Sequence, residues 1–142
     1  MTPYEVVYDA FLVKILEDEW AFWTEDEVKA DLRGLLESVI PWFKFPRVSL
    51  TNRGDDGFES DLGNEEIQIL ATYMKCEWLN RTILTWENVK PLYEERDFSQ
   101  ANLLSKLSAA LEAEKYNALK LERVYYRSIK GKTFKYRKLA GG

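Results

Sequence analysis

The 142-residue sequence contains no histidine and a single cysteine, Cys76. Without histidine the commonest general base and metal ligand is missing, and nucleophile pairs of the Ser-His or Cys-His kind are excluded. One thiol excludes an intrachain disulfide, which suits a reducing compartment. Cys76 lies in an apolar run with helical spacing, so we interpret it as a buried, inert thiol.

Phosphate-binding and membrane signatures are also missing. The glycines are scattered and form no phosphate loop. No apolar run reaches the length of a bilayer crossing, so we predict no membrane association. The segment Asp55–Asp61 resembles a calcium loop, but Gly63 stands where the bidentate glutamate is required. The remaining carboxylates favour helix first turns and polar faces. We therefore predict a protein that is not an enzyme and has no cofactor or metal site.

Helical spacing of apolar residues predicts a mainly α protein. A capping box at Thr2–Glu5 should begin a helix from Pro3 to about Asp18, with the Thr2 hydroxyl accepting from the backbone of Glu5. A second box at Thr24–Glu27 should begin a helix that Pro41 ends. The apolar faces of these two helices are Tyr4, Tyr8, Phe11 and Ile15 in the first and Val28, Leu32, Leu35, Leu36 and Val39 in the second.

Residues 42–63 change character. They alternate loosely between apolar and polar side chains, and Asn52–Gly57 is rich in turn-forming residues. Phe58 is a candidate for the start of a return strand. These features predict a small β-hairpin or extended loop near residues 42–60.

The strongest helical segment runs from Ile67 to Ile83 and is apolar on almost every side, which predicts a central helix. Thr85–Pro91 should interrupt it. Another helix should run from Ser99 to Arg127. Its seam toward the bundle repeats every seven residues, with two leucines between the repeats and Glu114 as an exception. The seam residues are Leu104, Leu107, Leu111, Ala118, Leu121 and Tyr125. We thus predict a bundle of about four helices over residues 1–128, followed by an extended basic C-terminal arm over residues 129–142.

Charge is divided unevenly along the chain. Residues 123–142 carry seven Lys and Arg and no acidic residue, which leaves 13 of the 20 basic residues against all 24 acidic ones, a balance of −11. Such asymmetry indicates a tail that meets an acidic partner, which could be nucleic acid, another protein or a second copy. The predicted partner-binding residues are Arg127, Lys130, Lys132, Phe134, Lys135, Tyr136, Arg137 and Lys138.

Three segments carry a resemblance to a known class of proteins: Glu65–Thr82, Trp86–Pro91 and Phe98–Asn102. They resemble small structural proteins encoded among the head and neck genes of tailed bacteriophages, most clearly over residues 60–107. The resemblance implies a head–tail connector, or adaptor. Such proteins are helical bundles that form a homo-oligomeric ring, typically of twelve copies, beneath the portal, and their C-terminal segments often extend to contact it. It further implies a location in the virion neck, with the host cytoplasm as the place of assembly, and DNA passing through the ring lumen.

Two other function classes stay open at the level of sequence. A nucleic-acid-binding accessory protein would use the basic, aromatic tail, although the acidic body would repel phosphates nearby. An enzyme that uses carboxylates would need two carboxyl groups with separated pKa values in one pocket. The connector interpretation accounts best for the tail and for the many aromatic residues together.

Overall fold

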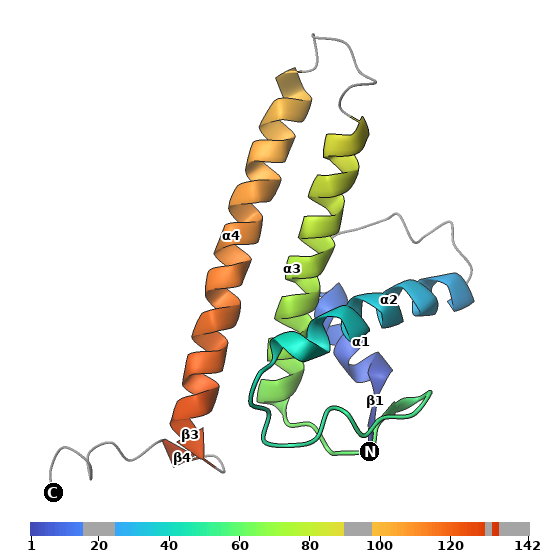
Figure 1. Cartoon of the computed structure of the whole chain (residues 1–142), viewed down its shortest axis with the longest axis vertical. Helices are drawn as coiled ribbons and strands as arrows, with labels where there is room; N and C mark the ends of the chain where they lie inside the picture. Colours follow the sequence, from blue (N-terminus) through green and yellow to red (C-terminus); the bar gives the residue numbers. More distant parts are fainter. Residues whose placement is uncertain (16–24, 90–97, 130–131, 134–142) are drawn as a thin grey trace, which may run out of the picture.

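The computed structural model describes residues 1–15, 25–89, 98–129 and 132–133 (Figure 1). Four helices dominate it, which confirms the predicted mainly α class with a small β element. In chain order the elements are β1 (Thr2–Pro3), α1 (Tyr4–Leu12), α2 (Glu25–Val39), the 3₁₀ helix η2 (Ile40–Trp42), β2 (Gly57–Phe58), α3 (Asn64–Val89), α4 (Phe98–Arg127), β3 (Ser128–Ile129) and β4 (Lys132–Thr133).

Helix α3 is the central element, as predicted. It contacts α1 and α2 on one side and α4 on the other. Its residues Ile69, Leu70, Ala71 and Met74 are at most 1% exposed, and they join side chains of α1 and α2 in the main core. The helix continues to Val89, so the interruption predicted from Thr85 begins too early. Thr82 and Thr85 lie within the helix, and each hydroxyl donates to the carbonyl four residues earlier.

Helix α1 begins where expected but is shorter than predicted. It ends at Leu12, after which Lys14 and Ile15 donate to carbonyls three residues earlier in a tightened last turn. The predicted apolar face is confirmed, because Tyr4, Tyr8, Phe11 and Ile15 are all buried. The rest of the predicted helix, to Asp18, lies outside the described residues.

The capping role predicted for Thr2 is wrong. Thr2 lies in β1, where it pairs with Phe58 of β2 in antiparallel register. Its hydroxyl donates to the Ser60 carbonyl at 3.0 Å and accepts from the Leu62 N–H at 2.8 Å. The hydroxyl that a local cap would have used therefore binds the backbone of Ser60 and Leu62, in the segment that follows β2.

The predicted hairpin is a tight turn over residues 53–58. The Gly54 N–H donates to the Gly57 carbonyl at 2.9 Å, and Arg53 bridges to Phe58. Residues 43–52 form a loop that crosses from α2 toward the base of α4 (Figure 1).

Helix α2 ends at Val39, two residues before Pro41, as predicted. The second capping residue, Thr24, lies outside the described residues.

Helices α3 and α4 form a long antiparallel hairpin whose upper part extends beyond α1 and α2 (Figure 1). A second, smaller core of Cys76, Leu79, Ile83 and Leu111 lies between them. The predicted α4 seam is confirmed at Leu111, Ala118 and Tyr125, which are 8%, 0% and 1% exposed. It is wrong at Leu121, which is 38% exposed, while the neighbouring Glu122 is only 6% exposed.

Candidate interaction surface

The structure describes two of the eight predicted tail residues. Arg127 is the last residue of α4 and is exposed. Lys132 lies in β4, paired with Ile129 of β3 directly after the helix. The other six lie outside the described residues: Lys130, Phe134, Lys135, Tyr136, Arg137 and Lys138. The site visible in the structure is therefore the root of the tail and the α4 helix that carries it.

A group of aromatic side chains fixes the lower end of α4. This basal aromatic cluster consists of Trp42, Phe43 and Phe45 from η2 and the loop that follows it, Tyr73 from α3, and Tyr125 and Tyr126 from α4. The ring centroids of Phe43 and Tyr125 are 5.2 Å apart and meet edge to face. Phe45 meets Tyr126 in the same way at 5.8 Å. Edge-to-face pairs add to the stability that burial alone supplies.

Arg47 completes the attachment of the loop to Tyr125. Its guanidinium lies 3.9 Å from the centre of the Tyr125 ring, and its backbone N–H donates to the Tyr125 hydroxyl at 2.7 Å. The guanidinium also donates to the Tyr125 backbone carbonyl, near the end of the helix where carbonyls lack helical partners. Burial raises the pKa of Tyr125 to about 12, so its phenol stays protonated in the physiological range.

A buried carboxylate lies at the centre of the cluster. Glu122 accepts hydrogen bonds from the hydroxyls of both Tyr73 and Tyr126. Burial raises its pKa, and the Tyr126 hydrogen bond and the positive charge of Lys44 offset part of that effect. The pKa of Tyr126 rises to about 12, through burial first and the Glu122 contact second. One acid therefore joins α3 to α4, and the Phe45 N–H donates to Tyr126 at 3.2 Å to attach the loop. The sequence pattern did not reveal this group, because Glu122 reads as a surface residue.

Above this cluster, α4 exposes both apolar and basic side chains. Tyr116, Leu119 and Val124 are 63%, 53% and 54% exposed. Lys106, Lys115, Lys120, Arg123 and Arg127 are also exposed. We call these eight residues the α4 outer face. Two of the three acidic residues of α4 point inward: Glu122 as above, and Glu114 to Lys75 at 3.1 Å. The third, Glu112, lies 3.7 Å from Lys115.

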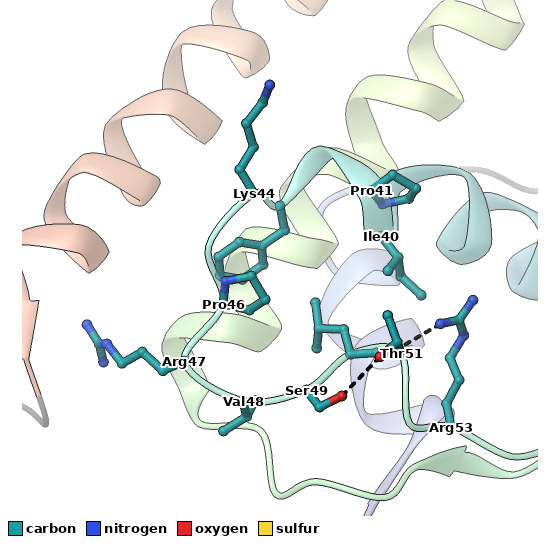
Figure 2. Close-up of a pocket in the computed structure, with 11 residues that line it drawn as sticks. Ile40, Pro41, Lys44, Pro46, Arg47, Val48, Ser49, Thr51 and Arg53 are labelled. Carbon is teal, nitrogen blue, oxygen red and sulfur yellow. Dashed lines mark hydrogen bonds between the residues drawn. The ribbon is translucent and has the colours of Figure 1, made fainter.

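A shallow depression of about 550 Å³ lies in the loop that follows η2, lined by Ile40, Pro41, Phe43, Lys44, Pro46, Arg47, Val48, Ser49, Leu50, Thr51 and Arg53. Its cations do not converge on its centre. Figure 2 shows Lys44 and Arg47 extending away from it. Arg53 contacts Glu37 at 2.5 Å, and this hydrogen bond is the largest cause of the lowered Glu37 pKa. Of the three cations that line the depression, Arg53 is thus paired with Glu37, and Lys44 and Arg47 point away from its centre. A ligand in the depression would therefore meet none of these charges directly.

Three observations on the described part of the chain concern metal, membrane and thiol chemistry. Its Cys, Asp and Glu side chains form no group of three that could hold a metal ion. None of its helices has the length and apolarity that a bilayer crossing demands. Burial raises the pKa of Cys76 to about 11, which keeps the thiol protonated and unreactive.

Comparisons with known proteins gave no match: not to a protein-family model, not to a curated protein and not to a solved structure. The functional interpretation therefore depends on the sequence resemblance and on the surface described above.

Proposed function

We propose that this chain is a virion structural protein, a head–tail connector that forms a ring and joins the portal to the tail or to the next neck component. The resemblance of residues 60–107 to phage head and neck proteins motivates this assignment. The mainly helical fold is of the kind that such an adaptor requires. The portal and the adjoining tail or neck proteins would be its partners.

The observation that carries the proposal is the α4 outer face. Tyr116, Leu119 and Val124 are more than half exposed on a helix that buries its other side on α3. Large apolar side chains clustered on one face are typical of an interface between proteins. In a ring each subunit lies between two copies of itself, so it needs such surfaces on two different sides.

The root of the tail supports a second contact. The basal aromatic cluster holds the end of α4 rigidly, and Arg127, β3 and β4 follow directly. A segment that leaves from a fixed point is well placed to reach a neighbouring protein, with its Lys and Arg residues steering the encounter. We assign residues 129–142 as an arm that binds the portal, with Phe134 and Tyr136 as anchors.

Truncation tests this assignment. A chain that ends at residue 128 retains all four described helices, so its far-UV circular dichroism should match that of the full chain. Its binding to purified portal, or to tailless heads, should be lost. A full-length variant with Phe134→Ala and Tyr136→Ala serves as a control for the length of the tail and should also bind weakly. Undiminished docking by both variants would contradict a role for the arm.

One observation favours a second function, a nucleic-acid-binding accessory protein. Lys120, Arg123 and Arg127 lead along the α4 outer face into the basic tail. Binding to phosphates releases counterions, so the affinity for DNA would fall steeply as the salt concentration rises. The binding of a DNA duplex measured from about 50 to 200 mM salt separates the two functions. An accessory protein would bind tightly at the low end and lose affinity steeply, whereas a connector would bind DNA only weakly even at about 50 mM salt.

A further inference from the structure

We infer that the α4 outer face of one copy binds an acidic face on α1 and the 53–58 turn of the next copy, in a head-to-tail contact. This inference rests on the proposed ring and specifies the two surfaces that would build it. The acidic face consists of Glu5 and Asp9 on α1 and Asp55 and Asp56 in the turn, all four exposed.

The two faces lie on different sides of the subunit. Helix α3 lies between α4 and the pair α1 and α2 (Figure 1). The acidic residues are brought together by the fold, because the Asp56 carbonyl accepts from the Tyr4 N–H at 3.1 Å, at the start of α1. Glu5 and Asp9 are four residues apart and therefore share one side of that helix. The neighbouring cation Arg33 shares Glu37 with Arg53, and its guanidinium also donates to the Asp55 carbonyl at 3.1 Å. The two arginines outweigh Glu37 by one charge, so the side that carries the four exposed carboxylates remains net negative.

Charge and apolar exposure are complementary between the faces. The α4 outer face places Lys120, Arg123 and Arg127 around Val124. The α1 side places Glu5 and Asp9 beside Val6 and Val13, which are 41% and 82% exposed. Opposite charges around exposed apolar side chains favour one relative orientation and disfavour the contact of each face with itself.

The lower part of the α4 outer face is similar in length to the α1 part of the acidic face. At about 1.5 Å per residue, Tyr116–Arg127 is about 16 Å long and Tyr4–Val13 about 13 Å long. Because the faces differ and lie on different sides of the subunit, their contact leaves a free copy of each face at the two ends of every oligomer. Such a heterologous contact continues from copy to copy until a ring closes.

Charge reversal provides the test. One variant carries Lys120→Glu and Arg123→Glu on α4, and a second carries Glu5→Lys and Asp9→Lys on α1. Self-association is measured by sedimentation velocity over a concentration series, and folding by circular dichroism. Each variant alone should associate at least about tenfold more weakly than the unmodified chain, because like charges then meet at the contact. A control with Glu77→Lys and Glu87→Lys makes the same charge change as the α1 variant, but on α3, and should associate normally.

An equal mixture of the two variants should recover association, because in an alternating oligomer every contact again joins opposite charges. If the α1 variant associates normally while the α4 variant does not, α1 is not the partner face and the inference is wrong. It is also overturned if the mixture does not recover, or if the unmodified chain stays monomeric throughout. Should the α1 variant fail to fold, Val13→Lys replaces it, because this position is 82% exposed and a positive charge there also meets the basic α4 outer face, with the same expected loss.

A different experiment tests the connector function, independently of the contact between copies. Docking of the unmodified chain on tailless heads tests that function whatever the charge variants do. A chain that docks but ignores charge reversal refutes only the contact proposed here. A chain that self-associates as described but never docks refutes only the connector assignment.

Discussion

Removal of the Glu122 carboxylate should destabilise the attachment of α4 to α3. In the Glu122→Ala variant, the hydroxyls of Tyr73 and Tyr126 lose their shared acceptor. A hydrogen bond to a charged group contributes about 1.5–3 kcal/mol. Tyr126 is 37% exposed, so water can replace its lost partner, whereas Tyr73 is partly buried and less accessible to water. Relief of the buried charge offsets part of the loss.

The expected net cost is therefore about 2 kcal/mol, mostly from Tyr73. For a chain of this size that cost lowers the melting temperature by about 6 °C. Thermal unfolding followed by circular dichroism at neutral pH measures it. A double-mutant cycle with Tyr73→Phe should give a coupling of about 1 kcal/mol or more. A variant as stable as the unmodified protein, or strictly additive single effects, would refute the reasoning.

The pH dependence of the same site has a definite sign. The pKa of Glu122 in the folded protein is raised above its ordinary value of 4.5. The folded state therefore binds the proton more tightly than the unfolded state, and this group favours folding most below 4.5. That contribution is lost as the pH rises through the raised pKa. The Glu122→Gln variant lacks it, so its stability relative to the unmodified protein should improve between about pH 4 and pH 7. Denaturant unfolding at both pH values gives the comparison, and an unchanged difference would contradict a raised pKa.

Three further outcomes follow from the packing. Gly57→Ala should cost about 1–3 kcal/mol in denaturant unfolding, because an added Cβ would lie 2.3 Å from a backbone oxygen of β1; Gly54→Ala has open space and serves as a nearly neutral control. Lys75→Met should cost about 2 kcal/mol by leaving Glu114 without its half-buried partner, whereas Lys75→Met with Glu114→Leu should restore most of that loss in the same assay. Cys76 should be inert to a thiol reagent at pH 8 and react only after unfolding, so rapid reaction of the native protein would contradict its burial.

The sequence predicted what local spacing determines. The apolar face of α1, the end of α2 before Pro41 and the end of α4 at Arg127 all depend on residues within a few turns of one another. Thr2 could not be assigned correctly, because its partner Phe58 is brought to it by the folded chain. The local cap and the distant backbone of Ser60 and Leu62 compete for the same hydroxyl, and only the fold decides between them.

The interaction surface was predictable only in part. A seven-residue repeat suggested Leu121 as a seam residue. On a helix of 3.6 residues per turn, however, Leu121 lies at one edge of the seam, and Glu122 lies at its other edge. Trp42 of η2 and Phe45 of the loop contact Tyr73 and Tyr126, the two partners of Glu122, so this side of α4 is covered. Glu122 is therefore buried and Leu121 is not. No spacing rule states which side of a helix a distant loop will cover. Of the tail residues predicted from charge, the structure places Arg127 and Lys132, and the others remain predictions.

Helix α4 packs against two separate cores, and the packing differs between its two ends. Near its end, Tyr125 is the one fully buried α4 side chain among the described residues of the main core. Farther up, α4 depends on the small core around Leu111 and on α3 alone. Backbone amides in the upper half of the hairpin should therefore exchange with deuterium faster than those around Tyr125. In such a subunit the upper half of the α3–α4 hairpin can open locally, while the basal end of α4, from which the tail departs, keeps its position.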